Sequence, residues 1–422
     1  MRSPIPDYLA EVHDTCGELL GGAVADYIPE LAAADPDTFA IALATVDGTV
    51  YAAGEADHRF TIQSMSKPFT YGIALADRGL DQVLAKVGVE PSGEAFNEIS
   101  LDPDTGQPRN PMINAGAILT HSLVEGEDAD ARFEHLRQTF SRIAGHPLPM
   151  DEDVFTSEWA TTHRNLAMGH MLKAVGVLDI DPVDAVEGYV RQCSITVNCR
   201  DLAMMAATLA NGGVQPASGE LIFRRRVVRQ VLSVMTTCGM YDAAGDWLTT
   251  VGIPAKSGVS GGIIGALPGQ VGIAVFSPRL DEHGNSVRGL RAFERLSRDM
   301  GMHLMDVTRD ARTSLRGSYV TDGDHPTEVH KVQGDLRFAG VESLVRAVSA
   351  QPPRASRVAF DLTRVSEIDD VSTRVLLEVI RRLHLDDKVE VLIIDPDHVL
   401  GEHGVEVPYA RRLHHVRELT AS

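Results

Sequence analysis

The sequence predicts an α+β protein of two domains, in which a sheet with a helical subdomain precedes a small α/β domain. Strand-like segments occur at both ends of the first part of the chain, at 37–54 and 255–278. Between them, residues 80–250 have mostly helical spacing and loops rich in Gly, Pro, Asp and Asn. From about residue 328 onward, strand-like and helical segments alternate, which is typical of a compact α/β domain.

The first domain contains several clear local signals. Residues 37–54 read DTFAIALATVDGTVYAAG, which predicts a β-hairpin turning at Asp47-Gly48, where positive φ is required. Residues 60–80 have helical periodicity, with Gly79 at the position of a C-cap. A second helix is predicted in CRDLAMMAATLANGG. The segments AKSGVSGGIIGALP and VGIAVFSP read as two strands, and a helix follows at about 286–300.

The domain boundary is predicted from a change in composition. Residues 306–327 are polar, mixed in charge and without periodicity, so we expect them to be a linker. The domains are therefore expected at 1–305 and 328–422. Within the second, EVHKVQGDLRF reads as a pair of strands. Two helices and two further strands are predicted after it, in GVESLVRAVSA, VSTRVLLEVIRRLHL, SRVAFDLTRV and KVEVLIID.

Composition excludes several classes of partner. The formal net charge of −20 repels phosphate, so neither nucleic acid nor an anionic membrane surface is expected to bind. No signal peptide or membrane span is evident, which favours a cytoplasmic protein whose four cysteines are free thiols. The 16 histidines show no metal-ligand spacing, so we expect no metal and no cofactor. An arginine series at near-helical spacing is expected to form a solvated face rather than a phosphate site: Arg288, Arg291, Arg295 and Arg298.

The most informative motif is Ser64-Met65-Ser66-Lys67. Residues three apart lie on one face of a helix, so Lys67 can reach the hydroxyl of Ser64, whereas Ser66 points elsewhere. Serine needs an adjacent base to act as a nucleophile, and a buried lysine can be neutral enough to serve. An isolated S-x-x-K occurs often by chance, but this one begins a helix after strand-like segments.

A second motif, Lys256-Ser257-Gly258, supports the same interpretation. It lies on a strand-like segment at the other end of the helical insertion and resembles the K-[ST]-G strand of penicilloyl-serine transferases. Alone, it would be read as a surface strand followed by a turn.

The chain resembles the bacterial-type, serine-dependent glutaminase family over residues 5–305. The matching segments begin at Tyr27 (YIPELA), Phe60 (FTIQSMSK), Pro111 (PMINAGAI) and Ala255 (AKSGVSGGI). The resemblance implies a serine β-lactamase/penicilloyl-serine-transferase-like fold and the hydrolysis of L-glutamine to L-glutamate and ammonia. It also implies a homo-oligomer, usually a tetramer.

The resemblance also assigns roles to single residues. It implies that Ser64 is the nucleophile, Lys67 its base and Tyr241 a proton shuttle to the leaving ammonia. It implies that glutamine contacts Tyr27, Gln63, Ser64, Asn114, Glu158, Asn165, Tyr189, Tyr241 and Val259.

These assignments agree with the chemistry of glutamine. Glu158 can neutralise the α-ammonium group, and Asn114 and Asn165 can bind the region of the carboxylate. Backbone N–H groups of Ser64 and Val259 are candidates for an oxyanion hole. Without the resemblance, Glu158 reads as a solvated helix residue, Asn165 as an ordinary amide and Tyr241 as a satisfied, partly buried tyrosine.

Two other functions remain open from the sequence. One is a different S-x-x-K hydrolase, namely a β-lactamase, a D,D-peptidase or an esterase, although no S-D-N or Y-x-N element is convincingly placed in the insertion. The other is a signalling scaffold with an inactive catalytic core. Against the scaffold, every residue implied to act keeps its chemical type.

The C-terminal domain resembles the STAS family, through VQGDLRF at Val332 and VAFDLTRVSEID at Val358. The resemblance implies a protein or nucleotide partner. Asp370 and Val371 stand where antagonist-type members carry serines, one of them phosphorylatable, so the usual phosphoswitch is not expected. Ser372 and Thr373 remain as acceptors at the start of the predicted helix.

Overall fold

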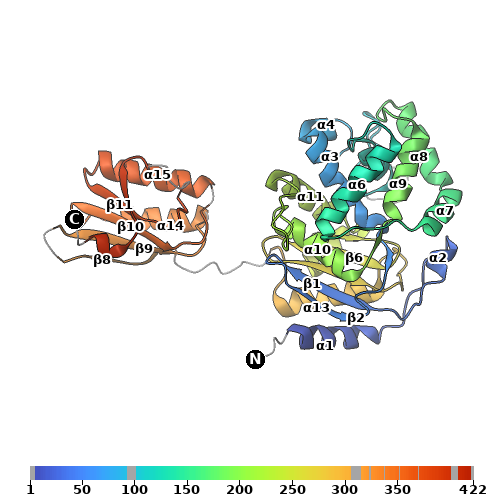
Figure 1. Cartoon of the computed structure of the whole chain (residues 1–422), viewed down its shortest axis with the longest axis horizontal. Helices are drawn as coiled ribbons and strands as arrows, with labels where there is room; N and C mark the ends of the chain where they lie inside the picture. Colours follow the sequence, from blue (N-terminus) through green and yellow to red (C-terminus); the bar gives the residue numbers. More distant parts are fainter. Residues whose placement is uncertain are drawn as a thin grey trace. The chain divides into compact units, whose positions relative to one another are not determined.

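The structure, a computed structural model, describes residues 5–92, 101–305, 315–322, 325–336, 338–350, 352–368, 370–400 and 407–419. The chain forms two units, Met1–Asp306 and Val307–Ser422 (Figure 1). Within the described residues, no helix is both long and apolar enough to cross a lipid bilayer.

An antiparallel sheet of five strands organises the first unit. Its strand order is β2-β1-β7-β6-β5, so strands from the two ends of the unit lie side by side and the helical region between them is an insertion. The predicted hairpin is confirmed, since β1 pairs with β2 and Gly48 has φ of 89°. The segment AKSGVSGGIIGALP forms two strands instead of one. The strands are β1 (Ala40–Thr45), β2 (Val50–Gly54), β5 (Ala255–Ser257), β6 (Gly262–Leu267) and β7 (Val271–Phe276).

The two faces of this sheet carry side chains of different size. Ile41, Leu43 and their counterparts on β6 and β7 pack in a cluster with helices α1 (Ile5–Gly17) and α13 (Val287–Met300). On the other face, alanines of β1 pack against α10 (Cys199–Ala210). At Gly272 an added Cβ would lie 2.1 Å from the backbone nitrogen of Ala207, so glycine is required for this close packing. Figure 1 shows α1 and α13 on one side of the sheet and α10 on the other.

The helical insertion covers the α10 side. It includes a short 3₁₀ helix, η1 (Gln63–Ser66), which leads directly into α3 (Lys67–Arg78). Helix α3 ends where predicted, because Gly79 has φ of 83°. A two-stranded ribbon of β3 (Phe60–Thr61) and β4 (Thr196–Val197) precedes η1 and α10. The other elements are α2 (Pro29–Ala32), α4 (Leu80–Leu84), α5 (Asn114–Ser122), α6 (Ala129–Ala144), α7 (Glu152–Thr161), α8 (His163–Ala174), α9 (Pro182–Cys193), α11 (Arg225–Cys238), η2 (Tyr241–Ala243) and α12 (Ala244–Thr250).

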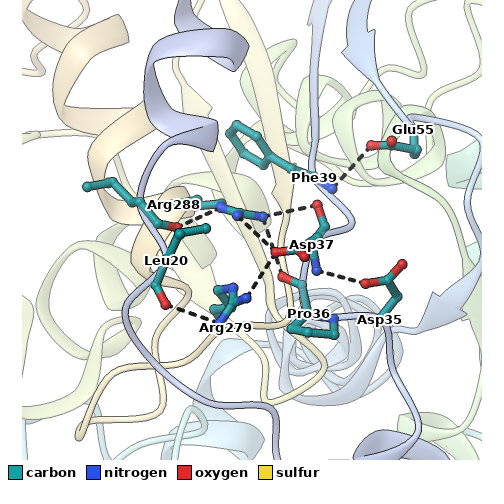
Figure 2. A network of polar contacts seen from close by, with 9 residues as sticks. Leu20, Asp35, Pro36, Asp37, Phe39, Glu55, Arg279 and Arg288 are labelled. Atoms are coloured by element: carbon teal, nitrogen blue, oxygen red, sulfur yellow. Dashed lines mark hydrogen bonds and ion pairs between the residues drawn. The ribbon is translucent and has the colours of Figure 1, made fainter.

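A buried arginine fixes the segment that leads into β1. The expectation that Arg288 belongs to a solvated face is wrong, because its side chain is only 3% exposed. Its guanidinium donates to the carbonyl oxygens of Leu19 at 2.9 Å and Asp37 at 3.1 Å (Figure 2). Arg279 donates to Asp37 Oδ1 at 2.9 Å, which joins the loop after β7 to the same segment. Periodicity places a residue on a helix face, but it does not show that backbone carbonyls turn toward that face.

We predict that Arg288→Ala lowers the free energy of unfolding by about 2–5 kcal/mol, because the carbonyl oxygens of Leu19, Pro36 and Asp37 lose their donor and a buried side chain is removed. Arg298, on the same helix, is 63% exposed, so Arg298→Ala should change that free energy by less than about 0.5 kcal/mol. Urea unfolding of the two variants measures the difference. Equal midpoints would show that the network does not hold the segment.

The second unit contains a separate five-stranded sheet with strand order β12-β11-β10-β9-β8. Strands β9 to β12 are parallel and β8 is antiparallel to β9. One apolar cluster includes residues of both helices, and a smaller one includes residues of η3. The elements are β8 (Leu315–Val320), β9 (Thr327–Gln333), α14 (Phe338–Ser349), β10 (Arg357–Arg364), α15 (Asp370–Leu385), β11 (Glu390–Ile394), β12 (Ala410–Leu413) and η3 (Val416–Leu419).

Two predictions for this region are wrong. The expected linker, 306–327, contains strand β8, and its residues 306–314 lie outside the described part of the chain. The expected strand pair in EVHKVQGDLRF is one strand, β9. An edge strand needs few apolar side chains, and Leu315 and Tyr319 supply the contacts of β8 with the two clusters. Polar composition therefore concealed a strand.

We predict that a chain ending at residue 306 folds by itself, because the apolar clusters of the first unit contain no residue beyond 302. A chain ending at residue 320 keeps β8 without β9, so its unpaired strand edge should promote association. Circular dichroism melting and size-exclusion chromatography compare the two. A shorter chain without a cooperative transition would show that the second unit is part of the first unit's fold.

Candidate active site

A cavity of about 320 Å³ opens between the sheet and the helical insertion of the first unit. Its walls come from the loop before α2, from η1, from the first turn of α5, from α7, α8 and α9, and from the turn between β5 and β6. The structure brings eight of the sequence-selected positions together there: Tyr27, Gln63, Ser64, Asn114, Glu158, Asn165, Tyr189 and Val259.

Ser64 and Ser66 differ sharply in their surroundings. Both lie on η1, a 3₁₀ helix, where residues three apart superimpose along the axis. Ser64 lines the cavity, whereas Ser66 is fully buried. The Ser66 hydroxyl donates to the carbonyl oxygen of Gln63 at 2.7 Å and accepts from Gln192 Nε2 at 3.0 Å. Ser66 therefore has a structural hydrogen-bond role, and Ser64 is the serine that a ligand can reach.

Lys67 is buried among neutral groups. Its side chain is 1% exposed, and its Nζ donates to Asn114 Oδ1 at 2.7 Å and to the carbonyl oxygen of Met112 at 3.1 Å. Burial lowers the pKa of Lys67 from 10.5 to about 7, because neither acceptor carries a charge that would stabilise the ammonium form. At neutral pH a substantial fraction of Lys67 is therefore neutral and able to accept a proton.

Tyr241 approaches Ser64 from η2. Its hydroxyl is a hydrogen-bond partner of Ser64, and burial raises the pKa of Tyr241, so the phenol stays protonated. The ring lies against a second buried lysine, with Lys256 Nζ 3.7 Å from the ring centroid. Tyr241 has φ of 55° and Gln63 has φ of 47°, conformations that non-glycine residues rarely adopt. Strained backbone therefore occurs both in the residue before Ser64 and in the residue whose hydroxyl contacts it, and such strain is typical of functional sites.

Glu158 provides a partly buried negative charge in the same cavity. Its Oε1 accepts from the Tyr27 hydroxyl at 2.7 Å and from Gln63 Nε2 at 3.1 Å. Burial raises the pKa of Glu158, and these two hydrogen bonds oppose the rise. Glu30 raises it further by charge repulsion; it accepts from the Ser157 hydroxyl at 2.9 Å, and its other oxygen is buried without a partner. This end of the cavity is suited to bind a cation.

The amides of Asn114 and Asn165 connect Lys67 to the cavity wall. Besides accepting from Lys67, Asn114 Oδ1 accepts from the Tyr189 hydroxyl at 3.1 Å. Asn114 Nδ2 donates to Asn165 Oδ1 at 3.1 Å, and Asn165 Nδ2 donates to the Thr162 hydroxyl at 2.9 Å. Since α5 begins at Asn114, the first turn of that helix fixes the position of the amide.

Two of the sequence-selected residues, Lys67 and Tyr241, lie behind the cavity wall and reach it through Asn114 and Ser64. Five further residues line the cavity and were not selected from the sequence: Thr161, Thr162, Arg164, Val190 and Cys193. Of these, Arg164 carries a positive charge next to Asn165. If the ligand is an amino acid, as the resemblance implies, its carboxylate needs a cation, and this requirement could have identified Arg164. Among the described residues, no group of His, Cys, Asp and Glu is arranged to hold a metal ion.

Comparisons with known proteins agree on one family. The family model described as Glutaminase matches residues 22–305. A glutaminase of Corynebacterium glutamicum is 49% identical over 404 residues, covering 95% of this chain and 97% of the relative. A glutaminase of Trichormus variabilis is 52% identical over 307 residues, covering 73% of this chain and 92% of the relative.

Solved structures give the same result. The crystal structure of a protein named Mglu matches with a TM-score of 0.87 and 48% identity, covering 94% of this chain and all of that one. A probable glutaminase from Bacillus subtilis, complexed with 6-diazo-5-oxo-L-norleucine, matches with a TM-score of 0.67 and 32% identity, covering 72% of this chain and 98% of that one. From the match over residues 22–305 and from relatives aligned along nearly its whole length, the chain belongs to the glutaminase family.

Proposed function

We propose that this protein hydrolyses L-glutamine to L-glutamate and ammonia through a covalent intermediate on Ser64. The observation that carries the proposal is the position of Lys67, which is buried with uncharged hydrogen-bond acceptors three residues after Ser64. Ser64 itself lines a cavity that also contains the partly buried carboxylate of Glu158. Glutaminase relatives of nearly the same length support the choice of substrate. They do not favour a β-lactamase, a D,D-peptidase, an esterase or an inactive scaffold.

The cavity residues supply a partner for each part of glutamine. Glu158 pairs with the α-ammonium group, and the nearby Glu30 strengthens the negative potential there. Asn165 and Arg164 bind the α-carboxylate. Tyr27 and Gln63 hold the Glu158 carboxylate in place through their hydrogen bonds to Oε1. The side-chain amide then points toward Ser64, and asparagine, shorter by one methylene, should react poorly.

The reaction proceeds in two balanced steps. Neutral Lys67 accepts the proton of the Ser64 hydroxyl as the oxygen attacks the amide carbon, and Tyr241 delivers a proton to the leaving nitrogen. Ammonia departs and leaves an ester on Ser64, with a proton on Lys67 and a phenolate on Tyr241. A water molecule attacks the ester and gives a proton to Tyr241, while Lys67 returns its proton to the departing Ser64 oxygen. The acid product then releases a proton to solvent and leaves as glutamate. Backbone N–H groups of Ser64 and Val259 stabilise the oxyanion. The turn between Gly258 and Gly262 allows this close approach of the backbone, with Gly261 at φ of 103°.

The second unit is proposed to be a STAS-like binding domain for a protein or nucleotide. The alternation of β9, α14, β10, α15 and β11 around a parallel sheet supports this assignment. Helix α15 begins at Asp370, while the side chains of Asp370 and Val371 lie outside the described residues. Ser372 is fully buried, which disfavours its phosphorylation. A homotetramer is proposed from family resemblance alone, and a cytoplasmic location from the four cysteines, which are free and buried.

Ser64→Ala should abolish hydrolysis, with a loss of about 10⁴-fold or more in kcat, while glutamine still binds, because only the nucleophile is removed. Ser66→Ala is the matched control, since it removes a hydroxyl two residues away. It should lose stability, by about 1–3 kcal/mol, because Gln192 loses a buried partner, yet retain most of kcat. Ammonia release measures activity, and calorimetry measures glutamine binding.

The reverse pattern, an inactive Ser66→Ala with an active Ser64→Ala, would refute the assignment of the nucleophile. Comparable kcat/KM values for glutamine and asparagine would refute the assignment of the substrate.

The pH dependence of kcat/KM should follow the deprotonation of Lys67. A base works only in its neutral form, so activity should be low below a pKa of about 7 and rise to a plateau above it. Glu158 adds to the loss at acidic pH, because its raised pKa lets it lose its charge earlier than an exposed glutamate. Arginine does not deprotonate in this pH range, so the Lys67→Arg variant should be inactive at every pH tested. A rise that occurs only near the ordinary lysine pKa of 10.5 would exclude Lys67 as the base.

A further inference from the structure

Three fully buried side chains form a hydrogen-bonded series next to the candidate active site: His121 of α5, Gln192 of α9 and Ser66 of η1. His121 Nδ1 lies 3.1 Å from Gln192 Oε1, and Gln192 Nε2 donates to the Ser66 hydroxyl at 3.0 Å. That hydroxyl donates in turn to the carbonyl oxygen of Gln63 at 2.7 Å. We call these three side chains the buried relay. None of them lines the cavity, so the buried relay can affect a ligand only through Gln63.

The direction of every hydrogen bond in the buried relay is determined. The Ser66 hydroxyl has one hydrogen, which it gives to Gln63, so it must accept from the amide nitrogen of Gln192. The amide oxygen of Gln192 then faces His121 and accepts from Nδ1–H. Burial lowers the pKa of His121 to about 4, so the imidazole is neutral at physiological pH and carries its one hydrogen on Nδ1.

A histidine at this position is unfavourable unless its N–H is needed. His121 Nε2 is buried and has no hydrogen-bond partner within the described part of the chain. Its neighbour must be glycine, because a Cβ added to Gly188 would lie 2.1 Å from Nε2. A leucine would fill the same space without an unpaired nitrogen. The property of His121 that leucine lacks is the donor directed at Gln192.

The other end of the buried relay acts on the strained residue that precedes Ser64. Gln63 has φ of 47°, and a non-glycine residue keeps such a conformation only where its surroundings fix it. The hydrogen bond from Ser66 to the Gln63 carbonyl supplies part of that fixation. In this conformation the Gln63 side chain donates to Glu158 Oε1, which also accepts from Tyr27. Both bonds end on Oε1, so Oε2 is the oxygen that can accept from an ammonium group.

We propose that His121 and Gln192 are positioning residues for substrate binding. Through the buried relay they hold Gln63 in the conformation that orients Glu158 toward the α-ammonium group of glutamine. This inference rests on the proposed function, which assigns Glu158 to that group. The hydrogen bond between Tyr241 and the proposed nucleophile does not pass through the buried relay. Disruption of the buried relay should therefore raise KM much more than it lowers kcat.

Gln192→Met removes the central amide and keeps a side chain of similar length. KM for glutamine should rise about tenfold while kcat stays within about threefold of the parent value. Ser66→Ala interrupts the buried relay at the next member and should show the same rise in KM. Gln215→Met is the matched control, because Gln215 is 1% exposed, accepts from the Ser218 N–H at 2.6 Å and does not line the cavity. It should leave KM unchanged, and melting curves show which variants are folded.

Two substitutions of His121 separate the hydrogen bond from the loss of the ring. His121→Asn keeps an N–H donor close to the position of Nδ1, whereas His121→Leu has no donor. KM should stay within about threefold of the parent value in His121→Asn and rise about tenfold in His121→Leu. A role limited to filling space would affect both variants alike, and an equal KM in the two would overturn the assignment of His121.

Inhibition by L-glutamate and by glutarate, which lacks the ammonium group, tests the connection to Glu158. Gln192→Met should raise the inhibition constant of L-glutamate about tenfold and leave that of glutarate unchanged. Equal weakening of both inhibitors, an unchanged KM in every folded variant of the buried relay, or an equal rise in Gln215→Met would overturn the inference. A parent chain that does not hydrolyse glutamine would refute the proposed function instead, so the two failures are distinguishable.

Discussion

The desolvation of Lys67 is the constraint on which the rest of the site depends. A lysine removed from water with only the Asn114 amide and one backbone carbonyl as acceptors favours its neutral form. A carboxylate partner would hold the proton on the lysine and remove the base. The neighbourhood is therefore built from amides, hydroxyls and phenols, and the carboxylate of Glu158 is bound to Tyr27 and Gln63 instead. Lys256 is also buried, and its burial together with the charge of Lys67 holds the pKa of Lys256 well below its usual value.

Water must be excluded from Lys67 for its pKa to stay low, and this requires a rigid enclosure. The order of strands and helices in the first unit supplies that enclosure. The sheet takes strands from both ends of the first unit, so the insertion is anchored on both sides. Small residues on β1 and β7 allow α10 to pack closely against the sheet. The Arg288 network holds the segment before β1, from which Tyr27 reaches the cavity, against α13 and the loop after β7 (Figure 2).

Part of the fold and of the site could be predicted from short stretches of sequence. The Asp47-Gly48 hairpin, the C-cap at Gly79 and the serine-lysine spacing depend on a few neighbouring residues, so the sequence alone identifies them. Glu158 and Asn165 look ordinary in sequence, because their function comes from burial by distant elements, and only family resemblance selected them. The burial of Arg288 and the pairing of β8 were missed for the same reason, since both depend on backbone groups that side-chain patterns do not report. Glu30 and Arg164 gave no signal in the neighbouring sequence, and only the chemistry of the ligand could have pointed to Arg164.

The central claim is that Lys67 is the base because burial makes it neutral near physiological pH. The chain has six lysines, so carbon-13 labelling of lysine side chains gives a spectrum simple enough to follow by NMR during a pH titration. Lys67→Met identifies the Lys67 resonance by its disappearance. The account predicts that this resonance titrates with a pKa of about 7, well apart from those of exposed lysines. Titration near 10.5 would show that Lys67 stays charged in the resting enzyme and would contradict the account.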